Sequence, residues 1–183
     1  ITYVNIDLEE VKRFKEEYSF EEIENWFLLT MKEFGKWSDF LYEWKIKRNK
    51  SIKNIEFPFE YRQGQRDLCV SVYRTIERES VLFIQAPTGV GKTMSNVFPA
   101  VKAMGEEKTD KIFYLTAKTI TRKVALEAFD ILREKGLIIK DIVITAKEKT
   151  CPYGMQCNPY GCPAANGHFD RVNNAVFDII NNE

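Results

Sequence analysis

Apolar residues recur at helical spacing through the first fifty positions of the chain. They step by three and four between residues 8 and 18, and a second stripe runs from Phe20 to Gly35. Ser19 and Glu22 have the spacing of a capping box, which opens that second helix. Apolar positions resume at Trp37 and continue to Trp44. The pattern predicts a small all-helical segment of three short helices with a shared core. A partner-binding face around Trp37 and Trp44 is the alternative use of these side chains.

Further along, short apolar runs alternate with helical stretches. The runs, each typical of a buried strand, are Val81–Gln85, Lys111–Thr116 and Ile142–Thr145. Helical patterns cover residues 64–78, 92–104 and 120–135, with a last helix over 168–180. Strands that alternate with helices of this length predict an α/β fold, a parallel sheet with flanking helices. The helical segment precedes it, and a cysteine-rich loop follows from residue 150.

Composition places the chain among globular proteins and excludes a membrane span. Hydrophobic residues make up 44% of the 183 residues and charged residues 30%. No stretch reaches 18 uncharged apolar residues, and no signal peptide is visible, so we expect a cytoplasmic protein. The start at Ile1 suggests a fragment.

Charge is balanced overall but strongly segregated near the N-terminus. The 27 basic and 27 acidic residues cancel, so the net charge argues neither for nor against binding to nucleic acid. Residues 1–44 hold eleven acidic and five basic side chains. The next nine residues, 45–53, hold five basic side chains and no acidic one: Lys45, Lys47, Arg48, Lys50 and Lys53.

The most informative motif lies between an apolar run and a helix, which is the context that a phosphate-binding P-loop requires. It consists of Ala86, Pro87, Thr88, Gly89, Val90, Gly91, Lys92 and Thr93. The two glycines allow a tight turn whose N–H groups face phosphate oxygens, and the helix adds its positive end. Lys92 is expected to reach the β- and γ-phosphates of ATP, and the Thr93 hydroxyl to bind Mg²⁺. Ala86 replaces the first glycine of the strict pattern, and a turn without ligand is the plain alternative.

The parts needed to hydrolyse ATP are incomplete in this sequence. Hydrolysis requires a second acidic site that holds Mg²⁺, and no Asp-Glu pair occurs in the chain. No arginine finger can be assigned. We therefore expect nucleotide binding without useful hydrolysis by this chain alone.

Two further segments carry candidate ligand contacts. Arg62 and Gln65 lie in the segment 61–66 before the P-loop, and the Gln65 amide suits the donor and acceptor groups of adenine. An ordinary helix N-terminus is the alternative. Candidate contacts to nucleic-acid phosphates follow the second apolar run, where a solvated helix cap is the alternative; they are Thr116, Lys118, Thr121 and Arg122.

The four cysteines divide into one buried and three clustered residues. Cys69 falls in a helical stripe and is expected to be a buried apolar residue. Cys151, Cys157 and Cys162 crowd into twelve residues without hydrophobic periodicity, which points to metal in a reducing compartment. His168 could complete a Cys₃His zinc site, or a fourth cysteine beyond residue 183 could complete an iron–sulfur site. Thiols that bind no metal are the remaining alternative.

These motifs together resemble the XPD/DinG-type iron–sulfur DNA helicases of superfamily 2, in the bacterial branch with a nuclease-like domain upstream. The resemblance covers about residues 57–181, including the segment 61–66, the P-loop, the segment 113–122 and the cysteine loop. It implies a RecA-like motor domain 1 from residue 56 to 149, and an iron–sulfur domain that begins in residues 150–183. Residues 1–55 would be a helical lead-in that matches no motif of the family.

The resemblance implies the front part of a 5′→3′ ATP-dependent DNA helicase with a [4Fe–4S] cluster. Its partners would be single-stranded DNA and duplex junctions, and we expect a monomer. The fourth cluster cysteine, the acidic pair and the second motor domain would lie downstream. Two other interpretations stay open: a Cys₃His zinc module that binds nucleotide without unwinding, and an interaction protein whose P-loop is vestigial.

Overall fold

The computed structural model describes residues 2–117, 119–153 and 160–182. These residues divide into two compact units, Ile1–Leu137 and Ile138–Glu183. The first unit holds the strands β1 (Thr2–Asn5) and β2 (Glu10–Arg13) and the helices α1 (Phe20–Asn54), α2 (Gln65–Glu77), α3 (Lys92–Gly105) and α4 (Thr119–Glu134). The second holds the short helix α5 (Lys147–Thr150) and the helix α6 (His168–Asn182).

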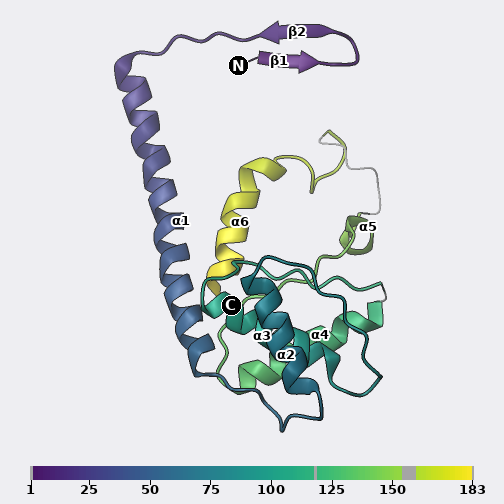
Figure 1. Ribbon diagram of the computed structural model, residues 1–183. Helices are drawn as coiled ribbons and strands as arrows, with labels where there is room; N and C mark the ends of the chain where they lie inside the picture. The colour runs from purple at the N-terminus through teal and green to yellow at the C-terminus, as the bar shows by residue number, and fades with distance from the viewer. Residues whose placement is uncertain (1, 118, 154–159, 183) are drawn as a thin grey trace. The chain divides into compact units, whose positions relative to one another are not determined.

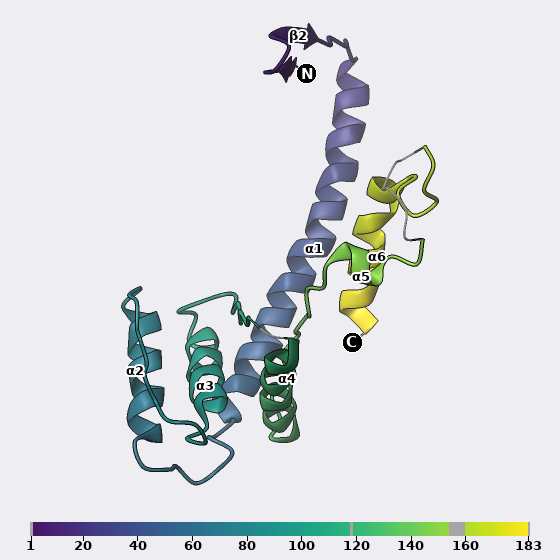
Figure 2. The same cartoon turned by 90° about the vertical axis from the view of Figure 1, so that its right-hand side faces the viewer.

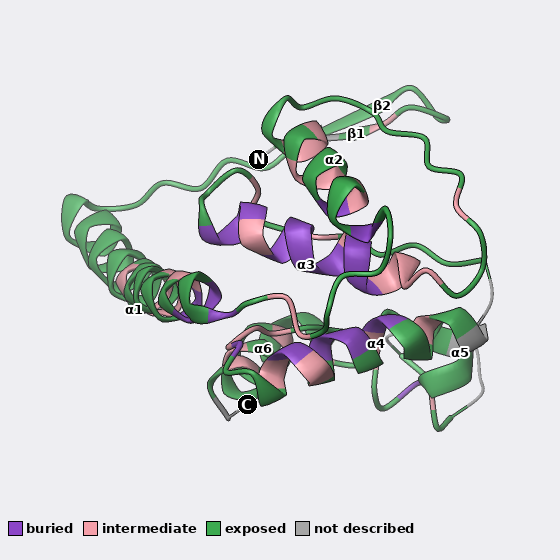
Figure 3. Ribbon diagram, turned by 60° about the horizontal axis from the view of Figure 1, so that its bottom comes forward, coloured by how far each residue is buried: buried purple, intermediate pink, exposed green. Residues whose placement is uncertain are grey.

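Helix α3 is the centre of the first unit. It contacts α1, α2 and α4 (Figures 1 and 2). Ten of its fourteen residues are buried, which is the pattern of a helix surrounded by others (Figure 3). The core residues with the least exposed surface are Ile52, Ile55, Val97, Val101, Ala103 and Leu132.

Helix α1 corrects the expectation of three short helices. The helix starts as predicted. The Ser19 hydroxyl accepts a hydrogen bond from the Glu22 amide at 3.3 Å, and the Glu22 carboxylate accepts one from the Ser19 amide at 2.7 Å. The helix then continues through Gly35 to Asn54, 35 residues in all. One interior glycine costs only about 1 kcal/mol, which is too little to end a long helix.

The first eighteen residues also differ from the prediction, since they contain a two-stranded antiparallel hairpin rather than a helix. Asn5 explains the turn, because its side-chain oxygen accepts from the amides of Asp7 at 3.1 Å and Leu8 at 3.2 Å. The expected small helical core is absent from this described region. Phe20 and Trp26 are 82% and 65% exposed.

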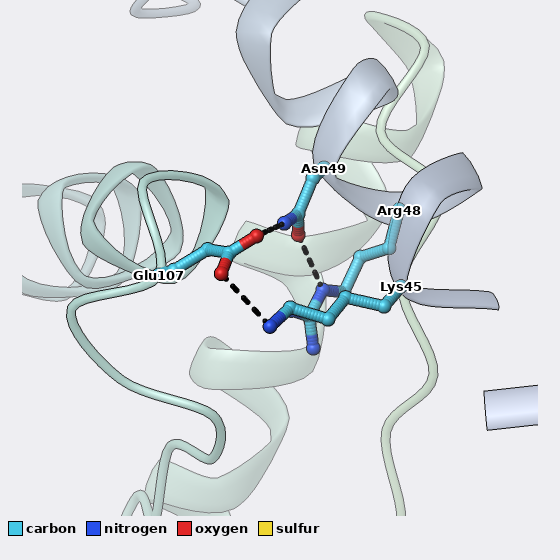
Figure 4. A network of polar contacts seen from close by, with 4 residues as sticks. All are labelled: Lys45, Arg48, Asn49 and Glu107. Carbon is cyan, nitrogen blue, oxygen red and sulfur yellow. Dashed lines mark hydrogen bonds and ion pairs between the residues drawn. The ribbon is translucent and has the colours of Figure 1, made fainter. Parts of the chain in front are cut away.

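The C-terminal end of α1 is fixed to α3 by three sets of contacts. The Lys102 ammonium donates to the main-chain oxygens of Ile52 at 2.9 Å and Ile55 at 3.0 Å, and so satisfies carbonyls at the helix end. Ile52 also packs directly against Gly105, where any added Cβ would lie 2.4 Å from it. The third set surrounds Glu107, which binds Lys45 at 2.9 Å and Asn49 at 3.3 Å (Figure 4).

The prediction of an α/β fold with a parallel sheet is wrong for the described residues, which contain no strands other than the antiparallel pair β1 and β2. None of the three apolar runs lies in a strand, and each has a large apolar side chain that faces solvent: Phe83 is 94% exposed, Leu115 88% and Ile144 83%. An apolar run predicts burial of side chains, but a strand also needs a neighbour for its N–H and C=O groups. That pairing is a property of the tertiary fold, and periodicity cannot supply it.

The helices predicted beside those runs are confirmed. The four patterns of residues 64–78, 92–104, 120–135 and 168–180 correspond to α2, α3, α4 and α6, with ends that agree within two residues. None of the helices in the described part of the chain is both long enough and apolar enough to cross a membrane.

Candidate functional site

The P-loop residues form a turn between the exposed segment 81–85 and helix α3. Gly89 and Gly91 both adopt left-handed backbone conformations, with φ of 85° and 76°. These values are strained for residues with a Cβ, so the two glycines are required by the path of the loop. The loop thus has the tight backbone turn that the motif predicts.

The N-terminus of α3 faces the loop without a side-chain cap. Gly91 is the N-cap residue, and the first intrahelical bond runs from the Ser95 amide to the Gly91 oxygen at 3.1 Å. The amides of Lys92, Thr93 and the next residue therefore have no acceptor within the helix. Together with the helix dipole, such amides are suited to bind an anion.

Lys92 folds back over the loop. Its Nζ atom donates to the main-chain oxygens of Ala86 at 2.8 Å and Pro87 at 2.7 Å. The ammonium is therefore held against the first residues of the loop. Phosphate oxygens could replace the two carbonyl oxygens as acceptors, because they bind the same donor with a full negative charge. Thr93 follows in the first turn of α3, and its predicted role toward Mg²⁺ stays a prediction.

Arg62 and Gln65 contact this loop from the start of α2. The Arg62 guanidinium donates to the Gly89 oxygen, and the Arg62 amide donates to the Gln65 side-chain oxygen at 3.0 Å. Gln65 is 5% exposed, and its amide nitrogen lies 2.5 Å from the point where a Cβ on Gly91 would stand. The structure thus places both residues against the phosphate loop, while their role toward adenine remains a prediction.

Ser95 is a further part of the site that the sequence did not reveal. It is fully buried, and its hydroxyl donates to the Gly91 oxygen at 3.0 Å. The Ser95 side chain also hydrogen-bonds the thiol of Cys69, whose pKa is raised chiefly by burial. Cys69 is 7% exposed, which confirms the prediction of a buried residue. The only signal for Ser95 in the sequence is its position one helical turn after Gly91.

The candidate DNA contacts lie around the start of α4. Thr116 is exposed in the segment before the helix, and Thr121 and Arg122 belong to its first two turns, with Arg122 half-buried. Lys118 lies outside the described residues. Their expected contacts to phosphates stay a prediction.

The candidate metal ligands are only partly described. Cys151 is half-buried at the end of α5, Cys162 is 1% exposed, and both are free thiols. His168 is exposed at the first position of α6, and the centroid of its ring lies 5.3 Å from that of the Phe169 ring. Cys157 lies outside the described residues. Within the described residues no group of three or more His, Cys, Asp or Glu side chains is placed to hold a metal ion.

Comparison of the chain with known protein families, with curated proteins and with solved structures finds no match.

Proposed function

We propose that this chain binds the phosphates of a nucleoside triphosphate, with ATP as the expected ligand, at the loop of residues 86–93. The observation that carries the proposal is the position of Lys92. Its ammonium lies 2.8 and 2.7 Å from two carbonyl oxygens of the loop, beside a helix N-terminus whose first amides lack intrahelical acceptors. A cation and oriented amides at one turn are the donors that a polyphosphate requires.

The proposal needs no parallel sheet, because the groups that would contact the phosphates come from the loop, α2 and α3. Gly89 and Gly91 set the path of the loop, and Gln65 packs against it. Thr93 would hold Mg²⁺ beside the phosphates, which would screen their charge. The binding chemistry is thus supplied by residues within one compact unit.

Within this proposal, the chain is the ATP-binding part of a 5′→3′ DNA helicase that works in the cytoplasm on single-stranded DNA. Support comes from the motif resemblance and from the contact of Arg62 with the loop. A [4Fe–4S] cluster would take Cys151, Cys157 and Cys162 as ligands. Two of these ligands, Cys151 and Cys162, are free thiols in the described part of the chain.

Binding of a fluorescent ATP analogue to the 183-residue chain tests the phosphate site. Loss of one charge-assisted contact costs about 1.5–3 kcal/mol, so Lys92→Ala should weaken binding by about 10- to 150-fold. AMP, which lacks the β- and γ-phosphates, should compete poorly with the wild-type protein. Lys108→Ala is the matched control, since the Lys108 side chain is exposed and pairs with Glu77 at 3.9 Å, away from the loop. Equal affinity of the Lys92 and Lys108 variants would refute the site.

A further inference from the structure

The basic run at the end of α1 separates into two groups with different environments. Lys45 binds Glu107, and Arg48 is 8% exposed beside Asn49, to which it donates at 3.0 Å (Figure 4). These two cations belong to the contact between α1 and α3. Lys47, Lys50 and Lys53 are exposed, and none of the ion pairs found in the described part of the chain includes them.

The three exposed lysines form a row on the solvent side of α1. Residues three apart are neighbours on a helix surface, and the row advances about 9 Å along the axis. The side of α1 that faces α3 carries Arg48, Ser51 and Ile52, which are buried. At about 100° per residue, the middle of the lysine row points roughly 150° away from that side. The row therefore faces solvent and is not used by the fold.

The row ends at a hollow on the same unit. This hollow has a volume of about 270 Å³ and is lined by Asn54, Glu56, Phe57, Pro58 and Lys135. It is somewhat smaller than the roughly 300–1,000 Å³ of pockets for drug-sized ligands, so it suits one part of an extended chain. Lys135 and Glu56 bring opposite charges to the hollow, so the positive charge of the surface comes from the row; the Asn54 amide offers a donor and an acceptor, and the Glu56 carboxylate accepts.

Aromatic rings accompany the hollow. Phe57 stacks on Tyr61 with ring centroids 4.2 Å apart, and Phe59 meets Phe57 edge-on at 6.4 Å. Phe59 and Tyr61 are 54% and 45% exposed. Cations that track a backbone beside exposed aromatic rings are the combination by which proteins hold single-stranded nucleic acid.

We infer that the row Lys47–Lys50–Lys53 and the adjoining hollow form a second binding surface, for single-stranded nucleic acid. The lysines contact phosphates of one strand, since the row presents three exposed cations within about 9 Å along the helix axis. A base beyond the row stacks on the exposed ring of Phe59, which lies edge-on to Phe57 beside the hollow. The inference rests on the proposed function only for the identity of the strand as DNA.

Salt-dependent binding of a fluorescein-labelled dT20 strand to the full chain tests this surface. Three lysine–phosphate contacts on a single strand contribute about 2 to the slope of log Kobs against log salt. The triple variant Lys47→Gln/Lys50→Gln/Lys53→Gln should lower the slope by that amount. The control Lys12→Gln/Lys15→Gln/Lys32→Gln has the same net charge, changes only exposed lysines and should leave the slope nearly unchanged. Equal slopes for the two triple variants would overturn the inference.

Two further measurements separate the single-strand proposal from its competitors. Phe59→Ala should weaken dT20 by about 1–3 kcal/mol, roughly 5- to 150-fold, and leave a 20-bp duplex unaffected. A duplex bound as tightly as dT20, with no effect of Phe59→Ala, would overturn the single-strand assignment. ATP-analogue binding should be unchanged in the lysine triple variant and reduced in Lys92→Ala. A reduced salt slope in the lysine triple variant would support this surface. If Lys92→Ala at the same time bound the ATP analogue as tightly as wild type, the phosphate site would be refuted and this surface would stand.

Discussion

Removing the ammonium of Lys102 tests what holds the end of α1 against α3. Its two short contacts, 2.9 Å to the Ile52 oxygen and 3.0 Å to the Ile55 oxygen, involve carbonyls of residues that are 1% and 2% exposed. A hydrogen bond to a charged group contributes about 1.5–3 kcal/mol net, and part of that gain is offset because burial disfavours the ammonium and lowers the pKa of Lys102. We expect Lys102→Met, which keeps an unbranched apolar stem but removes the ammonium, to cost about 2 kcal/mol.

Urea unfolding followed by circular dichroism measures this cost. With a slope of about 1–3 kcal/mol per molar, the midpoint should fall by about 1 M while the slope stays constant. Lys108→Met is the control, because its exposed ion pair with Glu77 at 3.9 Å contributes at most about 0.5 kcal/mol. If the two variants unfold within 0.5 kcal/mol of each other, on the order of that control effect, Lys102 does not cap α1.

Two contacts at the C-terminal end of α3 can also be tested by substitution. Gly105→Ala should destabilise the protein by about 1–3 kcal/mol, because its Cβ would lie 2.4 Å from the Ile52 side chain; Gly35→Ala, with nothing within 4 Å, should be neutral or stabilising in the same urea assay. Tyr73 donates to Glu106, which raises its pKa to about 12. Because the folded value exceeds the ordinary 10.0, the stability from this bond is fully present below pH 10 and is lost as the pH rises through about 12. Phenolate absorbance is titrated with pH in the wild-type protein and in Tyr73→Phe, and the difference between the two curves reports Tyr73. A midpoint of that difference near the ordinary pKa of 10.0 would contradict the prediction.

The helices could be predicted because their signals are local. The Ser19–Glu22 capping box is a four-residue pattern, and it forms as expected. Helices α2, α3, α4 and α6 follow from apolar periodicity that each segment carries by itself. The length of α1 could not be predicted, because Gly35 is a weak breaker and the contacts that fix the helix end come from α3.

The candidate site also has parts that the local sequence predicts and parts that depend on how the helices pack. The loop was identified from its own residues, and the left-handed conformations of Gly89 and Gly91 agree with the turn that the motif requires. The approach of Gln65 to Gly91 and the bond from Ser95 depend on how α2 and α3 pack, which no local pattern encodes. The expected sheet failed for the same reason, because strand pairing is not a property of any one segment.

The metal question turns on His168, the only histidine in the chain. Its side chain is exposed at the start of α6, and its main-chain amide donates to the Ala165 oxygen at 3.2 Å. We therefore expect His168 not to be a ligand, and that any metal is held by thiolates alone. Cobalt titration under reducing, anaerobic conditions tests this, since thiolate-to-cobalt bands report ligation. His168→Ala should leave the spectrum and affinity unchanged, whereas Cys151→Ser, at a half-buried position, should reduce both. Loss of a tetrahedral cobalt spectrum in His168→Ala would instead establish the Cys₃His zinc module.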